Sequence, residues 1–168
     1  MVGVMKPTDL VVTPTGLRFL NRRVACTIGR GGVRDDKVEG DGASPRGVHD
    51  FVGLLYRPDR MAKPVPWAVP ILPGDLWSDD PRHEDYNLMV RAPYGHSHEV
   101  LRRADPMYDL VLLTNWNWPY AQRNKGSAIF VHQWRRPGYP TAGCIGLRRD
   151  DLRWVVQNLR IGAKLYIL

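Results

Sequence analysis

The chain has 168 residues, a length that suits one domain with a core of its own. Its 24 lysines and arginines outnumber its 17 aspartates and glutamates, so the formal net charge at pH 7 is +7. This charge favours an anionic partner, but the basic residues are scattered in pairs and no nucleic-acid-binding motif accompanies them. No apolar run is long enough to span a membrane, and residues 1–10 lack the apolar core of a signal peptide. We therefore expect a single domain, residues 1–168, with no membrane span and no nucleic-acid partner; the oligomeric state stays open.

Short strands are expected along the first third of the chain. Residues 9–20 contain two β-type runs around a Thr-Pro-Thr-Gly turn, which predicts a hairpin. Residues 23–28 alternate, and Cys26 within them is interpreted as a core residue. Residues 47–55 are apolar and predict a buried strand. The polar, glycine-rich residues 35–47 before it predict a loop, which on composition alone is a solvated connection.

Residues 57–75 are unusually rich in proline. Proline lacks a backbone donor and fixes φ, so this segment is neither a central strand nor a helix interior. Apolar residues interleave with the prolines, which favours packing against the body of the protein over a free linker. We interpret the segment as a rigid flap that walls the functional site. Its prolines are Pro58, Pro64, Pro66, Pro70 and Pro73.

Residues 76–103 predict loops followed by one short helix. Ser97 is a suitable N-cap for a helix over residues 97–103. His96 and His98 form a His-x-His pair, but a metal site needs a third ligand, so we expect neither a metal nor another cofactor. His98 either faces a substrate or lies on the helix surface, and the sequence alone leaves both interpretations open.

The last third of the chain predicts more β-structure and a helix. Residues 108–114 form an apolar strand, and residues 115–120 form an aromatic loop that belongs either to the core or to a substrate-facing wall. Residues 150–159 carry one apolar face at helical spacing, with Asp150 as the expected cap, and residues 164–168 form a final strand. Many short strands with one or two helices indicate a mainly β protein.

One stretch carries candidate chemistry. Residues 127–132 alternate like a strand that ends at His132, and a turn-rich loop leads on to Cys144. A thiol becomes a strong nucleophile once a nearby imidazole removes its proton. Ala142 and Gly143 are small, so the backbone amides of residues 142–144 can approach a substrate carbonyl and form an oxyanion hole. On these residues alone a buried, inert cysteine remains the alternative.

The surrounding motifs resemble the catalytic signature of the YkuD-type L,D-transpeptidases, in which an upstream His is followed by Ser/Thr-x-Gly-Cys. Residues 37–47, residues 77–80 with Tyr86-Asn87, and residues 108–111 resemble further blocks of that family. The resemblance implies that the loop over residues 35–47 frames the entrance to the sheet that carries the site. The resemblance covers residues 10–168. It implies a YkuD-like β-sandwich of two mixed sheets with one or two helices, located in the periplasm or cell envelope and working without a cofactor.

The resemblance also implies a function and a set of site residues. The function is peptidoglycan L,D-transpeptidation, in which stem peptides are cross-linked through a cysteine acyl-enzyme. Cys144 is the expected nucleophile and His132 the base, with Gly143 contributing to the oxyanion hole. The carbonyl of Gln133 is expected to orient His132. The residues expected to contact the substrate are Thr141, Ala142, Gln133, Arg148, Tyr86 and His98, with Arg149 as a further candidate.

Some positions depart from the common family pattern. Ala142 stands where the family often has His, and Gly146 where it often has Arg. These departures, the short loop between His132 and Cys144, and the proline-rich segment resemble a branch that forms 1,3 instead of 3,3 cross-links. Two alternatives remain: a cysteine hydrolase, either an L,D-carboxypeptidase or an amidase, that releases the same acyl-enzyme to water, and a non-catalytic wall-binding module.

Overall fold

The computed structural model describes residues 3–168 as a mainly β fold with one α-helix, which confirms the predicted fold class. No helix in residues 3–168 combines the length and apolar character needed to cross a membrane. In chain order the elements are β1 (Leu10–Thr13), β2 (Gly16–Phe19), β3 (Arg22–Val24), β4 (Cys26–Thr27), β5 (Val33–Arg34), β6 (Ser44–Pro45), β7 (Gly47–Tyr56), β8 (Val69–Pro70), β9 (Asp75–Ser78), β10 (Met89–Arg91), β11 (His98–Val100), β12 (Leu110–Thr114), β13 (Phe130–Gln133), β14 (Ile145–Leu147), α1 (Arg149–Asn158) and β15 (Lys164–Ile167).

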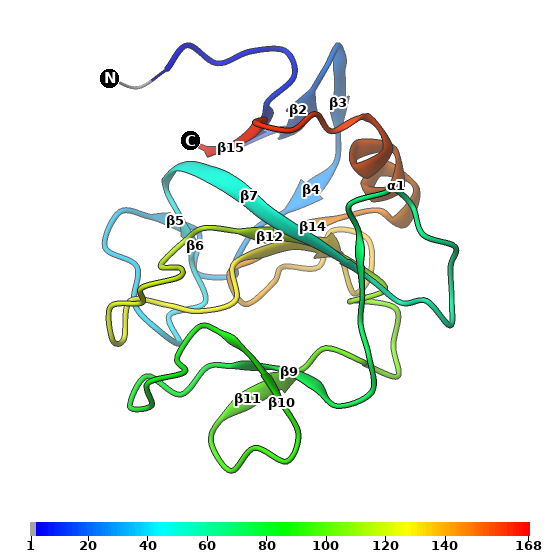
Figure 1. Cartoon of the computed structure of the whole chain (residues 1–168). Helices are drawn as coiled ribbons and strands as arrows, with labels where there is room; N and C mark the ends of the chain where they lie inside the picture. Colours follow the sequence, from blue (N-terminus) through cyan, green and yellow to red (C-terminus); the bar gives the residue numbers. More distant parts are fainter. Residues whose placement is uncertain (1–2) are drawn as a thin grey trace.

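Ten strands form one curled, mixed sheet. Its order is β3-β2-β1-β15-β7-β12-β13-β14-β4, with β8 added beside β7. The pairs β1 with β15 and β13 with β14 are parallel, and most other pairs are antiparallel. The two end strands, β3 and β4, are separated only by Ala25 in the chain, so the sheet has to curl until its edges approach each other. Figure 1 shows β3 leading directly into β4.

The central strands β7, β12, β13 and β14 divide the interior into two cores. Successive residues of a strand point to opposite faces, and here both faces are covered. Leu112 and Val131 belong to the core beneath α1, whereas Val111 and Phe130 belong to the second core. The second core lies toward the three-stranded sheet β10-β9-β11, which forms the base of the molecule in Figure 1, while α1 lies on the other side of the central strands.

Helix α1 buries the face that the sequence predicts. Leu152, Val155 and Val156 are buried in the first core, and the spacing of these residues places them on one side of a helix. The predicted cap is wrong. Arg148 is the N-cap residue and Asp150 lies in the first turn, where its negative charge is favourable for the helix dipole.

Several other predictions can be compared with the fold. The hairpin over residues 9–20 is confirmed as β1 and β2, and β7 contains the predicted strand over residues 47–55. The helix predicted from Ser97 is wrong, because residues 98–100 form β11 and pair with β9. The local capping signal at Ser97 is overridden by backbone hydrogen bonds to a strand about twenty residues earlier in the chain.

Candidate active site

The register of two parallel strands brings Cys144 and His132 to the same face of the sheet. Strand β13 pairs with β14 so that Val131 lies opposite Ile145, and both of these side chains point into the core beneath α1. Cys144 precedes Ile145 by one residue and therefore points the other way, into the second core beside Phe130. His132 follows Phe130 by two residues and shares that face, so the thiol and the imidazole, at the two ends of the connecting loop, line the same cavity.

The Cys144 sulfur is held between two backbone groups. Its S–H donates to the carbonyl oxygen of Ala128 at 3.0 Å, and the N–H of Phe130 points to the sulfur from 3.4 Å. Only 8% of the residue is exposed, and burial raises the pKa of the thiol to about 12. In the resting protein Cys144 is therefore a neutral thiol whose S–H donates a hydrogen bond to the Ala128 carbonyl.

The His132 imidazole is held in one tautomer. Its Nδ1 lies 2.7 Å from the carbonyl oxygen of Gln133, and because a carbonyl only accepts, Nδ1 carries the proton and Nε2 is free to accept one. The ring of Tyr108 packs edge-on against the imidazole with 5.2 Å between ring centres. Burial lowers the pKa of His132 to about 4. Thiol and imidazole are thus both neutral near pH 7.

Side-chain hydroxyl groups shape the loop that carries Cys144. The Thr141 hydroxyl donates to the Cys144 carbonyl at 2.5 Å and accepts the Gly143 N–H at 3.0 Å. The Ser44 hydroxyl, fully buried, donates to the Gly143 carbonyl at 2.6 Å and accepts the Gly29 N–H at 2.9 Å. Ser44 therefore fixes the loop from a segment 99 residues away, and no feature of its local sequence marks it as a site residue.

The oxyanion hole expected at residues 142–144 needs one revision. The Gly143 N–H is already donated to Thr141, so it is not available to a substrate in this conformation. Within residues 3–168 the N–H groups of Ala142 and Cys144 have no such partner and remain available. Gly143 instead provides shape: its φ of +141° is a glycine conformation, and a Cβ there would lie 2.8 Å from the Ala43 carbonyl oxygen.

A polar cavity of about 520 Å³ opens beside the cysteine. Its walls carry charges of both signs, with basic side chains from four separate segments and carboxylates from three. Residues of the predicted glycine-rich loop are among them, as expected for a loop that frames the entrance. The lining side chains that matter for the chemistry are Cys144, His132, Thr141 and Ala142, the basic Arg30, Lys37, Arg103 and Arg135, and the acidic Glu39, Asp79 and Glu99.

A model of the YkuD family, described as the L,D-transpeptidase catalytic domain, matches residues 6–167. The chain belongs to this family. Among curated proteins none matches the chain. Membership implies peptidoglycan as the class of substrate and an association with the cell envelope, and it agrees with a buried thiol and imidazole that share one cavity.

In this L,D-transpeptidase domain Tyr86 lies behind the cavity wall. Its hydroxyl donates to the Glu39 carboxylate at 2.5 Å and accepts the Gly126 N–H at 2.8 Å, and only 3% of the residue is exposed. The Ser127 hydroxyl donates to the same carboxylate at 2.8 Å. Tyr86 therefore positions a cavity-lining acid and does not itself line the cavity, unlike the direct substrate contact that the sequence predicts.

Four other predicted contact residues lie outside the cavity. His98 is exposed on β11, where its Nδ1 lies 2.7 Å from the His96 carbonyl oxygen. Arg148 is directed toward Asp151 on α1, 3.4 Å away, and Arg149 follows it at the start of the helix. The side chains of Gln133 and Arg149 line a separate, small hollow near α1, so only the Gln133 carbonyl takes part in the site.

The proline-rich segment does not wall the cysteine cavity, and the flap interpretation is wrong. Among the described lining residues none comes from residues 57–75. Residues 60–64 instead line a hollow together with Arg153 of α1, and β8 adds to the edge of β7, a position where proline is tolerated. The local composition indicates a rigid packed segment correctly but carries no information about which surface it covers.

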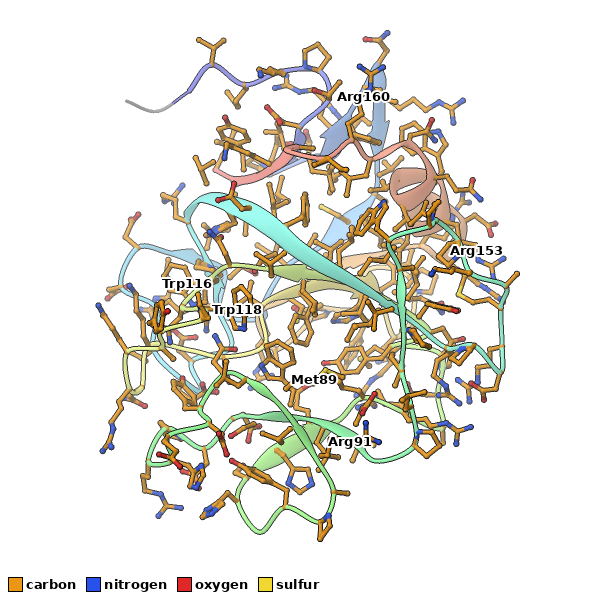
Figure 2. All side chains as sticks on the ribbon, in the orientation of Figure 1. Met89, Arg91, Trp116, Trp118, Arg153 and Arg160 are labelled. Atoms are coloured by element: carbon orange, nitrogen blue, oxygen red, sulfur yellow. The ribbon has the colours of Figure 1, made fainter. Side chains whose placement is uncertain are left out.

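The aromatic loop does not form a wall of the cysteine cavity: its two tryptophans are half-buried against the body of the protein, and Tyr120 at its end is 94% exposed. Trp118 packs against the second core, and the ring of Trp116 lies edge-on to His49 with 5.8 Å between ring centres. Neither indole is among the residues that line the cysteine cavity. Figure 2 shows both tryptophans on the side of the molecule opposite Arg153.

Proposed function

We propose that this protein is a peptidoglycan L,D-transpeptidase that works through a Cys144 acyl-enzyme. The observation that carries the proposal is that a buried thiol and an imidazole with an unprotonated Nε2 line one cavity. A merely structural cysteine needs neither the cavity nor the fixed tautomer. The family supplies the substrate class, peptidoglycan stem peptides.

In the acylation step His132 Nε2 takes the thiol proton while the sulfur attacks the donor carbonyl. The imidazolium then returns that proton to the leaving amine, and a thioester joins the donor to Cys144. In the second step the acceptor amine attacks the thioester, His132 removes its proton, and the thiol is restored. A resting site with a neutral thiol and a neutral imidazole suits this order of steps, because a neutral imidazole is ready to accept a proton and the thiolate is formed only when a substrate is present.

The tetrahedral intermediate places a negative charge on the donor oxygen. The N–H groups of Ala142 and Cys144 are the proposed donors to that oxygen, since they are free within the described chain and adjoin the sulfur. Thr141, Gly143 and Ser44 hold these donors in place from behind. Preorganised backbone donors act without side-chain rearrangement during the reaction.

The charged walls suit a peptide that carries both carboxylates and amines. Arg30 and Arg135 line the cavity and form no ion pair within residues 3–168, so their guanidinium groups are available to stem-peptide carboxylates. The carboxylates of Glu39, Asp79 and Glu99 present the opposite sign, which is favourable for an amine. This assignment replaces Arg148 and Arg149 as the proposed carboxylate contacts.

Replacing Arg135 with glutamine is expected to raise KM for a stem-peptide substrate about fivefold and to leave kcat nearly unchanged, because a charge-assisted contact at the cavity mouth is lost. Arg148→Gln is the matched control, since it removes the same charge from an exposed helix start outside the cavity. Steady-state kinetics of both variants provide the test. An equal rise in KM in the two variants would contradict the assignment and indicate a long-range charge effect.

The product formed from purified muropeptides tests the proposed function itself. The wild-type protein and Cys144→Ala are incubated with the same muropeptides, and the products are analysed by mass spectrometry with fragmentation. Cross-linked dimers that require Cys144 are the expected result, and the donor residue in them, the third or the first of the stem, distinguishes 3,3 from 1,3 linkage. Cleaved monomers without dimers would replace transpeptidation with hydrolysis, and unchanged muropeptides would favour a wall-binding module.

A further inference from the structure

Asn87 is a buried side chain whose role the proposed chemistry leaves unassigned. Only 2% of the residue is exposed, and its amide group forms four hydrogen bonds. Oδ1 accepts the indole N–H of Trp77 and the backbone N–H of Ala128, each at 2.9 Å. Nδ2 donates to the carbonyl oxygens of Trp116 at 3.0 Å and Asn117 at 2.7 Å. Every donor and acceptor direction of the amide is therefore used.

The backbone at Asn87 is adapted to this arrangement. Its φ of +60° lies in the left-handed region, which asparagine tolerates better than most residues. Its own N–H donates to the Ser78 carbonyl at 2.9 Å, which anchors the residue to the end of β9. Asn87 thus connects the small sheet and the aromatic loop to the chain segment just before β13.

The Ala128 peptide links Asn87 to the cysteine. Ala128 also has a left-handed φ, +54°, a conformation that costs an alanine free energy and needs support from its surroundings. The support on one side is the Asn87 amide, which accepts its N–H. On the other side the Ala128 carbonyl accepts the Cys144 S–H. Two residues further on, the Phe130 N–H points to the same sulfur.

We propose that Asn87 is a positioning residue that, through the Ala128 peptide, fixes the Cys144 sulfur between the Ala128 carbonyl and the Phe130 amide. The inference rests on the proposed function in one respect, namely that Cys144 is the nucleophile. Asn87 does not line the cavity, so it acts on the thiol and not on the substrate. Its contribution is to hold a strained peptide in the one orientation that places an acceptor at the sulfur.

Two consequences follow for the thiol. The Ala128 carbonyl stabilises the protonated form, because only S–H can donate to it, whereas the Phe130 N–H stabilises the thiolate. If the hydrogen bond from the Ala128 N–H to Asn87 is lost and the Ala128 peptide changes orientation, the neutral thiol loses its acceptor and the thiolate becomes easier to form. The sulfur also loses its fixed position, and small displacements of a nucleophile are costly for catalysis.

The test is the pH dependence of Cys144 alkylation in Asn87→Gly, a change that fits a positive φ and removes all four side-chain hydrogen bonds. Alkylation by iodoacetamide is followed by peptide mapping, which separates Cys144 from Cys26 and needs no peptidoglycan. The profile is expected to move to lower pH by about half a unit, the size of one lost hydrogen bond. With muropeptides, kcat is expected to fall about tenfold at nearly constant KM.

Asn117→Gly is the matched control. Asn117 also has a positive φ, +49°, and its side chain bonds to the backbone of Gln122 and Gly126 but not to Ala128. A comparable loss of thermal stability with an unchanged alkylation profile is expected for it. Asn87→Asp is the conservative variant, because it keeps the acceptor for Ala128. Its added negative charge should leave the profile in place or move it to higher pH.

The outcomes separate the inference from the proposed function. If Asn87→Gly and Asn117→Gly shift the alkylation profile equally, or if Asn87→Gly changes only the melting temperature, Asn87 has a purely structural role and the inference is overturned. A shifted profile in a protein that does not process muropeptides would support the positioning of Cys144 while overturning transpeptidation. A shift to lower pH in Asn87→Asp would contradict the role of Oδ1 as the acceptor.

Discussion

Replacing Cys144 with serine or His132 with asparagine is expected to lower kcat at least about a thousandfold each. Serine retains a hydroxyl, but its proton is far harder to remove than that of a thiol, and the buried imidazole, with its pKa lowered to about 4, is too weak a base to remove it efficiently. Asparagine in place of His132 removes the proton acceptor altogether. Both losses appear in kcat with little change in KM, because neither residue supplies the charged contacts that bind the stem peptide.

The double variant provides a sharper version of this test. Cys144 and His132 act in one proton transfer, so their joint replacement is expected to cost no more than the worse single replacement. Cys26→Ser is the control, because this second free cysteine lies on β4 and is absent from the lining of the cavity. Full activity in Cys26→Ser with none in Cys144→Ser would locate the nucleophile. Additive losses in the double variant would contradict a shared step.

The pH profile of the same wild-type enzyme reports on the imidazole. Burial lowers the pKa of His132 to about 4, so in the free enzyme the base stays unprotonated as the pH falls below the ordinary imidazole value of about 6.5. The acidic limb of kcat/KM is therefore expected near pH 4. Because the pKa is lowered, activity is present above it and is lost as the pH falls through it. A half-loss at about pH 6.5 would mean that His132 is solvated or not the base.

The local features of this site could be predicted from sequence because they depend on neighbours in the chain. The strand predicted over residues 127–132 is confirmed for Phe130–Gln133, which places His132 near its end, whereas residues 127–129 lie outside the strand; the small residues before Cys144 correctly indicate a tight turn. The register that brings the two together depends on β13 and β14 being parallel neighbours. That pairing is a property of the whole sheet; the family resemblance implied that Cys144 and His132 act together, but not the strand register that brings them to one cavity.

The supporting contacts could not be predicted because each joins segments that are distant in the chain. Ser44 bonds to Gly143 across 99 residues, and Asn87 bonds to Ala128 across 41. Nothing in the composition of either loop signals its partner. The same limitation explains Arg148, a plausible anion contact by its position after the cysteine, which the start of α1 directs toward Asp151 instead. The hydrogen-bond partners of residues that bond outside their own segment are determined by how the whole chain packs.

Replacing Gly143 with alanine is expected to lower the free energy of unfolding by about 3 kcal/mol and the melting temperature by roughly 10 °C. Two effects combine at this position. The φ of +141° is strained for any residue with a Cβ, and the added methyl group would lie 2.8 Å from the Ala43 carbonyl oxygen and 3.3 Å from the Ile129 side chain. The nearest contact is backbone, so relief requires the loop itself to move.

Movement of this loop would also displace the groups around the nucleophile, Cys144. Gly143 lies between the two free amides proposed for the oxyanion hole, and its own carbonyl is held by Ser44. A displaced loop would misalign those donors, and loss of one well-placed oxyanion donor costs about a hundredfold in kcat. We therefore expect a folded Gly143→Ala protein to lose at least that much activity below its melting temperature, with a smaller effect on KM.

Gly138→Ala separates crowding from backbone strain. Gly138 lies in the loop between His132 and Cys144 and has a positive φ of +71°, but apart from its chain neighbours no heavy atom of residues 3–168 lies within 4 Å of the position its Cβ would occupy. Its replacement should cost only the strain, about 1 kcal/mol, and leave kcat nearly unchanged. Thermal melts and kinetics of both variants decide the matter. If the two replacements behave alike, the close approach of Gly143 to Ala43 is not what shapes the catalytic loop.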